Sequence, residues 1–221
     1  MAYNFSLEDR ALQHIRSQIQ WKIIRKNSGE RGFGIRSCRE KKEHVIFFPR
    51  RSCSPFYKLD LLHEFIHALH CETLPPAFSS NIHKWFLPFG LSYEIKNYFN
   101  AAGDWFVAGR MAELCREKML EQIDCEYNSV KNGFKESMTD KQYLIAGLVS
   151  AQAAKWLQYK PISGGKVEKI VAALLSAAPE EAALENFYVL LKGICGAFNK
   201  FTVEMVEENG LKLWHYRRLY V

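Results

Sequence analysis

Apolar and polar residues alternate with two different periods along the chain, and the first part of the sequence contains both. Residues 7–20 place leucine or isoleucine at helical spacing on one face, which predicts an amphipathic helix. Three short runs rich in aromatic and β-branched residues follow, separated by glycine-rich or charged segments. We expect strands there, at residues 21–25, 33–38 and 44–49.

A second helical pattern begins near Leu59 and meets neither glycine nor proline before Pro75-Pro76. Ser54-Pro55 in front of it is typical of a helix start, with serine as the N-cap and proline at the first helical position. The two prolines at the other end should stop the helix. The pattern therefore predicts one helix between these signals, directly after the small sheet.

The rest of the chain keeps helical spacing almost throughout. A helix is expected from Tyr93 to about Tyr127, with a break near residues 131–133. Later helices are expected at residues 141–158, 167–178 and 179–200. Residues 202–208 either extend the last helix or follow it, ahead of an aromatic and basic tail. The predicted class is α+β and predominantly helical, with a small N-terminal β-sheet, a helix carrying the functional motif and a C-terminal helical bundle.

Composition agrees with a globular protein whose 221 residues are 48% hydrophobic and 24% charged. We divide the chain into a domain at residues 1–130 and a helical domain at residues 138–221 that packs on it. The N-terminus lacks the pattern of a signal peptide, and no 18-residue apolar run predicts a membrane span. Six cysteines without a Cys-x-x-Cys pair favour reduced thiols in the cytoplasm.

The most informative segment is His63-Glu64-Phe65-Ile66-His67, within the second predicted helix. Histidines four apart on a helix project from one face, so their imidazoles can bind one zinc ion. The glutamate next to the first histidine can then reach a water at the metal. We expect His63 and His67 to be zinc ligands and Glu64 to be the general base. The competing interpretation is a surface helix with unremarkable histidines.

A catalytic zinc site has three protein ligands, so one more is required. The sequence leaves three candidates open: Asp104, Glu94 and His83. Asp104 is favoured because a buried carboxylate needs a partner and because Ala101-Ala102-Gly103 would let its helix approach the zinc helix closely. The alternatives for Asp104 are a capping role or an ion pair with Arg110. His70 lies on the same stripe as His67. It could support a metal ligand, contact the substrate or be an ordinary residue at the end of the helix.

These motifs resemble those of zincin-type metallopeptidases, in particular the group found beside von Willebrand A-type domains. That group carries an Asn-x-x-x-Asp stretch after the His-Glu-x-x-His helix, and Asn100 and Asp104 have the same spacing in this chain. The resemblance covers roughly residues 40–110. It implies a zincin-like domain with His63, His67 and Asp104 as ligands and Glu64 as base. SprT-like proteases show a weaker resemblance, through His83-Lys84-Trp85-Phe86, but this chain lacks their cysteine-pair zinc ribbon.

The expected activity is a zinc-dependent hydrolase, most simply a peptidase, that acts on a peptide or protein substrate. Glu64 would take a proton from a water activated by Zn²⁺ and pass it to the leaving amine. Tyr93, Tyr98 and His83 are candidates for stabilising the oxyanion. An edge strand beside the cleft is expected, from the resemblance, to pair with an extended peptide.

Two other classes of function remain as alternatives. One is a non-catalytic, metal-stabilised module whose C-terminal helices recruit a partner protein. The other is a nucleic-acid-associated protein, SprT-like or with an incidental motif, because the net charge is +6 and basic residues cluster at several places. Those basic clusters are more simply solvated surface. No membrane partner is expected.

Overall fold

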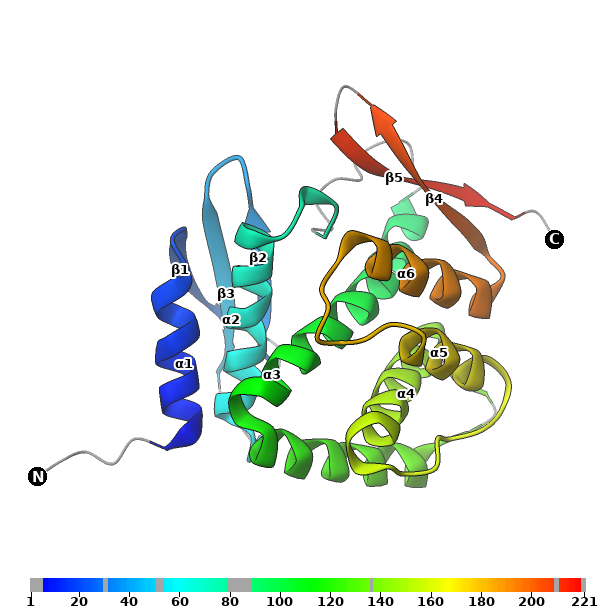
Figure 1. The fold of residues 1–221 in the computed structure, drawn as a ribbon, viewed down its shortest axis with the longest axis horizontal. Coiled ribbons are helices and arrows are strands. Elements are labelled where there is room, and N and C mark those ends of the chain that lie inside the picture. Colours follow the sequence, from blue (N-terminus) through cyan, green and yellow to red (C-terminus); the bar gives the residue numbers. More distant parts are fainter. Residues whose placement is uncertain are drawn as a thin grey trace, which may run out of the picture.

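The computed structural model describes residues 6–29, 32–50, 54–78, 89–135, 137–208 and 211–219. A small sheet and two helices form one side of the molecule, and a long helix connects them to a second group of helices and a hairpin (Figure 1). The helices are α1 (Leu7–Gln18), α2 (Tyr57–Thr73), α3 (Phe89–Gly133), α4 (Asp140–Gln152), α5 (Gly165–Leu175) and α6 (Leu184–Phe198). The strands are β1 (Lys22–Ser28), β2 (Gly34–Cys38), β3 (Glu43–Pro49), β4 (Phe201–Glu208) and β5 (Leu211–Arg218).

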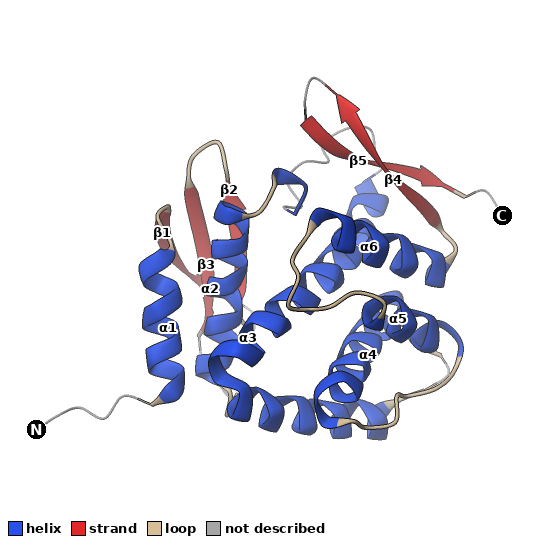
Figure 2. Ribbon diagram, in the orientation of Figure 1, coloured by secondary structure: helices blue, strands red, loops and turns tan. Residues whose placement is uncertain are grey.

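The predicted class is confirmed: helices dominate, and the N-terminal sheet is small (Figure 2). The three predicted strands and the helix before them occur, with bounds shifted by a few residues. In the sheet, β3 lies in the centre, parallel to β1 and antiparallel to β2. Strand β2 is consequently an edge strand, and this position matters for the site described below.

Helix α2 begins later than predicted. Its first residue is Tyr57, and Ser54 accepts a hydrogen bond from the backbone N–H of Phe56 in a turn before the helix, instead of capping it. The helix ends at Thr73, directly ahead of the two prolines, as predicted. Its apolar residues are buried against α1, α3 and the sheet, which leaves one polar face. The motif His63–His67 therefore lies in the middle of a well-packed helix.

The C-terminal end of α2 is tied to the sheet by Glu72. Its carboxylate accepts hydrogen bonds from the backbone N–H groups of Gln20 and Trp21, both at 2.9 Å, and lies 2.9 Å from Nε2 of His44. His44 is fully buried on β3, and its Nδ1 lies 2.7 Å from the hydroxyl of Ser37 on β2. Burial lowers the pKa of His44 although Glu72 opposes that shift. This network orients α2 against β2, β3 and the residues that lead into β1.

Helix α3 is a single element with a kink. Cys115 has non-helical backbone angles (φ −143°, ψ 44°), and the helix continues on both sides of it. Upstream of the kink, Trp105 is fully buried and donates a hydrogen bond from its indole N–H to Ala177 O at 2.9 Å. A Cβ at Gly109 would lie 2.1 Å from Pro179 O. Only glycine therefore fits at this position, where the loop between α5 and α6 crosses α3. These contacts hold α3 against the C-terminal helices.

The predicted helical domain at residues 138–221 ends in strands, so the segment 202–208, left open as an extension of the last helix or a segment after it, does not extend the helix. Residues 201–208 form β4, which pairs with β5 in an antiparallel hairpin. The sequence carries the signal: apolar Phe201 and Val203 alternate with polar Thr202 and Glu204, which is the period of a strand, and the structure buries the two apolar residues. Asn209-Gly210, a dipeptide typical of two-residue hairpin turns, separates the two runs in the sequence.

The last helix also starts later than predicted. Pro179 was expected to open it, but α6 begins at Leu184, and the segment before it is a turn in which the N–H of Ala183 bonds to Glu181 O. The hairpin packs back on the rest of the chain because Trp214 donates its indole N–H to Ala77 O at 2.7 Å. One apolar core runs from α1 to β5. None of the described helices combines the length and apolar character needed to cross a bilayer.

Candidate metal centre

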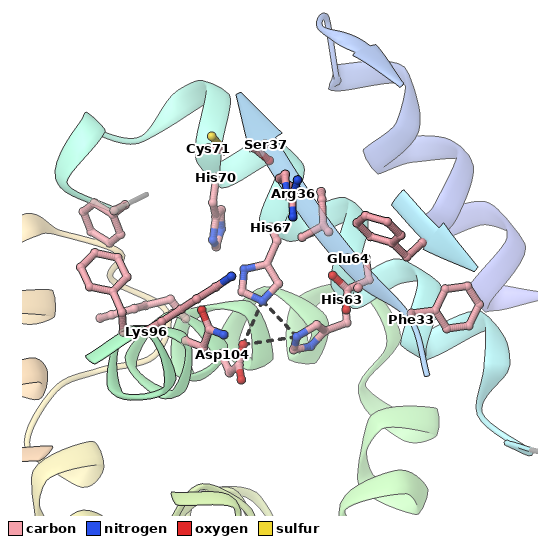
Figure 3. Close-up of a pocket in the computed structure, with 18 residues that line it drawn as sticks. Phe33, Arg36, Ser37, His63, Glu64, His67, His70, Cys71, Lys96 and Asp104 are labelled. Atoms are coloured by element: carbon pink, nitrogen blue, oxygen red, sulfur yellow. Dashed lines mark hydrogen bonds and ion pairs between the residues drawn. The ribbon is translucent and has the colours of Figure 1, made fainter. Parts of the chain in front are cut away.

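Helix α2 and the N-terminal half of α3 bring three side chains together. His63 and His67 are one helical turn apart on the polar face of α2, and Asp104 faces them from α3. Nε2 of His67 lies 3.0 Å from Nε2 of His63 and 2.9 Å from Oδ1 of Asp104, and the His63–Asp104 distance is 3.4 Å. Figure 3 shows the three groups pointing at one another. We call them the triad.

Close packing of the two helices makes this convergence possible. Ala101 and Ala102 are buried in the core, and Gly103 faces His67. A Cβ at Gly103 would lie 3.6 Å from Cε1 of His67, which is ordinary contact distance. The small residues thus let α3 approach α2 until a carboxylate meets the imidazoles directly. This is the close approach that the sequence predicted.

The charges within the triad depend on one another. Burial acts against a charge on His63, but the hydrogen bond and negative charge of Asp104 outweigh it and raise the pKa of His63 to about 9. Burial likewise acts against ionisation of Asp104, while the two histidines outweigh it and lower the pKa of the carboxyl. Without a metal, His63 therefore carries a proton near neutral pH and is paired with the ionised carboxylate of Asp104, and a metal ion bound there would take the place of that proton.

The triad lies in a cavity of about 450 Å³. One wall is the edge strand β2, from Gly34 to Ser37, and the opposite wall is α3. The triad side chains remain 25–29% exposed, so solvent reaches them. A segment entering this cavity would pass between the triad and β2, which is an edge strand in the described part of the sheet.

Glu64 follows His63 on α2 and lines the same cavity. In Figure 3 it lies beside His63, on the side of the triad toward Phe33. Among the described residues its carboxylate has no hydrogen-bond partner and no ion-pair partner. A carboxylate in this position is available to accept a proton from a group held at the triad.

The donor set and spacing suit zinc. Zn²⁺ takes histidine nitrogens and carboxylate oxygens at about 2.0–2.2 Å, and in a tetrahedral site such ligands lie roughly 3.3 Å from one another. The three triad separations of 2.9–3.4 Å are close to that edge length. Among the described residues, this is the one group of three His, Cys, Asp or Glu side chains whose ligand atoms lie within 4.8 Å of one another.

The other candidate third ligands have different outcomes. Glu94 does not line the cavity; its carboxylate lies 3.4 Å from Nζ of Lys200, the residue before β4. His83 lies outside the described residues. Arg110, the alternative partner for Asp104, pairs with Glu113 instead. Asp104 is therefore the candidate that the structure places beside both histidines.

The oxyanion candidates are not supported by position. Tyr98 is fully buried and stacks on Phe198 with ring centroids 4.8 Å apart, and it does not line the cavity. Burial, together with nearby acidic groups, raises the pKa of Tyr98, so its proton is tightly held. The side chain of Tyr93 lies outside the described residues, as does His83. The sequence could not separate a core tyrosine from an active-site tyrosine on one helix.

Several cavity residues were missed or left undecided by the sequence. Lys96, four residues ahead of Asn100 on α3, lines the cavity, as does Arg36 on the edge strand. His70 does so too, and in Figure 3 it points into the cavity above His67. Burial and the nearby positive groups lower the pKa of His70 to about 3, so it is neutral near pH 7. For Lys96, its helical spacing from Asn100 and Asp104 was the available signal.

Comparison of the chain with protein-family models, with curated proteins and with solved structures found no match. The resemblance to zincin-type metallopeptidases therefore stays a prediction. The function has to be argued from the triad, from Glu64 and from the cavity.

Proposed function

We propose that the chain is a zinc-dependent hydrolase, most specifically a peptidase, with His63, His67 and Asp104 as its zinc ligands. The single observation that carries the proposal is the convergence of these three side chains in a solvent-reached cavity. Structural zinc sites close the coordination sphere with four protein ligands, whereas catalytic sites use three. Three ligand groups beside an open cavity therefore favour catalysis over a purely structural role.

Each chain residue then has a defined task. The triad would hold the ion, and zinc bound there would supply Lewis-acid activation of water and of a substrate carbonyl. Glu64 accepts the proton of the attacking water and delivers it to the departing amine nitrogen. Lys96 and His70 face the same cavity, so they are the candidates for stabilising the negative charge that develops on the carbonyl oxygen.

The edge strand β2 provides the means to hold a peptide. Among the described strands it pairs with β3 alone, on one side, and its residues Gly34 to Ser37 form a wall of the cavity. An extended peptide could add to this edge through main-chain hydrogen bonds, which places its scissile bond near the triad. A peptide or protein substrate is favoured over a small molecule because an edge strand can recognise the main chain of an extended peptide.

The test is hydrolysis of casein and of a peptide library by zinc-loaded protein, with Glu64→Gln as the decisive variant. We expect Glu64→Gln to bind zinc with the stoichiometry of the unmodified chain and to lose about 10²- to 10⁴-fold in turnover. Glu117→Gln, an exposed carboxylate on α3, is the matched control and should keep full activity. Full activity of Glu64→Gln would show that the role given to Glu64 is wrong.

The same measurements separate the alternatives. Stoichiometric zinc without hydrolysis of any substrate would favour a metal-stabilised module that recruits a partner through its C-terminal helices. Absence of zinc combined with steeply salt-dependent DNA binding would favour a nucleic-acid-associated protein. As part of the same proposal we place the chain in the reducing cytoplasm, because Cys38, Cys71, Cys115, Cys125 and Cys195 are free thiols.

A further inference from the structure

A second cavity of about 340 Å³ lies next to the first at the candidate metal centre. Phe33, His63 and Glu64 line both cavities. The second cavity extends from them toward the C-terminal half of α3 and toward α4. Whatever is bound at the triad would therefore have this cavity directly beside its reacting bond. We call this cavity the side pocket.

The walls of the side pocket are mostly apolar. They come from both sides of the kink in α3 and from the facing surface of α4. The apolar lining residues are Phe33, Ala108, Met111, Met119, Ile123, Ile145, Leu148 and Val149. Ile145 is 46% exposed although it belongs to a packed helix, so apolar surface reaches solvent at this pocket. Walls with two methionines adapt readily to an inserted aliphatic chain.

The side pocket also contains two carboxylates that share one neutral partner. The amide nitrogen of Gln122 donates to Oδ1 of Asp60 at 3.1 Å and to Oε1 of Glu126 at 2.9 Å. Both hydrogens of that amide are then used, and the remaining carboxylate lone pairs have no donor from it. Within the described ranges, neither Asp60 nor Glu126 forms a direct ion pair, although the charge of His63 acts on both from a greater distance. Burial raises the pKa of Glu126, with the charge of Asp60 adding to the shift.

We propose that the side pocket binds a side chain with a long aliphatic stem and a terminal cation, that is, a substrate lysine or arginine next to the scissile bond. This inference rests on the proposed function and names its substrate class. The stem would lie against the methionine and aliphatic walls, and the cation would reach Asp60 and Glu126.

Other side chains fit the same pocket less well. A purely apolar side chain would fill the walls but remove water from two carboxylates without giving them a donor, which is costly. An acidic side chain would meet like charge. A lysine or arginine supplies apolar contact along its stem and charge-assisted hydrogen bonds at its tip, the arrangement these side chains adopt elsewhere.

The first test compares two peptides that differ only by lysine or norleucine beside the cleaved bond. Norleucine keeps the stem and lacks the ammonium. We expect kcat/KM to favour the lysine peptide by about tenfold or more, the scale of a charge-assisted hydrogen bond. In the double variant Asp60→Asn, Glu126→Gln this ratio should fall toward one, since both amides can still accept from Gln122. Glu121→Gln, an adjacent carboxylate that does not line the pocket, is the control and should keep the ratio.

A second test does not depend on catalysis. The ¹³C-labelled methyl groups of Met111 and Met119 are monitored by NMR while n-hexylammonium or 1-hexanol is added to the zinc-loaded protein. We expect saturable shifts of both methyl groups, with the ammonium binding about tenfold more tightly and the Asp60→Asn, Glu126→Gln variant losing that difference. Equal binding of the two probes overturns the inference.

The two tests distinguish failure of the peptidase proposal from failure of the side pocket assignment. If no peptide is cleaved while n-hexylammonium still binds preferentially at Met111 and Met119, the peptidase proposal fails and the cation-binding pocket is supported. If peptides are cleaved but lysine and norleucine are equivalent, the peptidase proposal stands and the side pocket assignment is wrong. Circular dichroism of the double variant confirms that it is folded before either ratio is interpreted.

Discussion

Asp104 and Asp140 each lie between two basic side chains, and both have a pKa lowered by those partners against the effect of burial. Asp104 meets two imidazoles at 2.9 and 3.4 Å. Asp140, at the start of α4, meets the ammonium groups of Lys166 and Lys200 at 3.2 and 2.5 Å. Their exposed fractions are also similar, 25% and 20%.

The difference lies in what the partners can do. A lysine ammonium has no lone pair, so the Asp140 group is complete as it stands and joins α4, α5 and the start of β4. An imidazole nitrogen can give up its proton and present a lone pair, so the Asp104 group can exchange protons for a metal ion. Charge and burial alone do not distinguish a ligand site from a structural ion pair; the chemistry of the partners does.

The largest expected effect is on zinc affinity. Asp104→Ala removes one of the three proposed ligands and should weaken zinc binding by more than about 100-fold, beyond the 10- to 100-fold typical of groups that only support a ligand. Asp140→Asn should leave zinc affinity unchanged. Competition titration against a chromophoric chelator measures both. Equal zinc affinities of the two variants would contradict the proposal that Asp104, and not Asp140, belongs to a metal site.

The next largest effect is expected on the free energy of unfolding. It concerns the contact between Gly109 on α3 and Pro179 in the loop before α6. Gly109→Ala places a methyl group 2.1 Å from Pro179 O, so the backbone must move. We expect a loss of about 1–3 kcal/mol in the free energy of unfolding, as for other overpacked sites. Gly196→Ala, where a Cβ meets nothing within 4 Å, is the matched helical control and should be neutral or stabilising. Urea denaturation compares them.

Asp140→Asn should have a smaller effect on unfolding, about 1 kcal/mol at pH 7, because its lysine partners are 38% and 41% exposed and solvent screens such pairs. The folded-state pKa of Asp140 is lowered, so its contribution is present above the unfolded value of about 3.9 and is lost as the pH falls below it. The difference between variant and unmodified chain should therefore shrink toward pH 3.5. A difference that is constant with pH would contradict the ionic account.

The smallest effect is expected from His44. Its folded-state pKa is lowered by burial, so the unfolded chain binds a proton more readily below pH about 6.5. Stability from neutral His44 is full above that pH and decreases as the pH falls, by less than about 1 kcal/mol at pH 6. Unfolding titrations of the unmodified chain and of His44→Gln from pH 8 to 5.5 give the difference. An identical pH dependence would exclude His44 as a contributor.

Local spacing was sufficient to predict the part of the site that lies on one helix. His63 and His67 share a face because they are four residues apart, and a helix between proline signals was readable. Asp104 is 37 residues after His67, so its position beside the histidines depends on how α2 packs on α3. The small residues next to Asp104 favour close packing of the two helices, but they do not specify it. Glu94 shares the helix but pairs with Lys200, a partner more than a hundred residues away.

The remaining differences also have physical reasons. The kink at Cys115 carries no proline or glycine to announce it, and the side pocket exists only because residues on both sides of that kink face α4. The C-terminal hairpin, by contrast, has a sequence signal, because apolar and polar residues alternate from Phe201 onward. It follows a long helical pattern, which is why the sequence alone leaves residues 202–208 open between an extension of the last helix and a separate segment.

The central claim is that one zinc ion binds at the triad. Elemental analysis of purified protein, combined with X-ray absorption spectroscopy, measures this most directly. We expect one zinc per chain with nitrogen and oxygen ligands at about 2.0–2.2 Å, and loss of that zinc in His63→Ala and Asp104→Ala. Protein that takes up no stoichiometric zinc, or zinc that stays with sulfur ligands in both variants, would contradict the account.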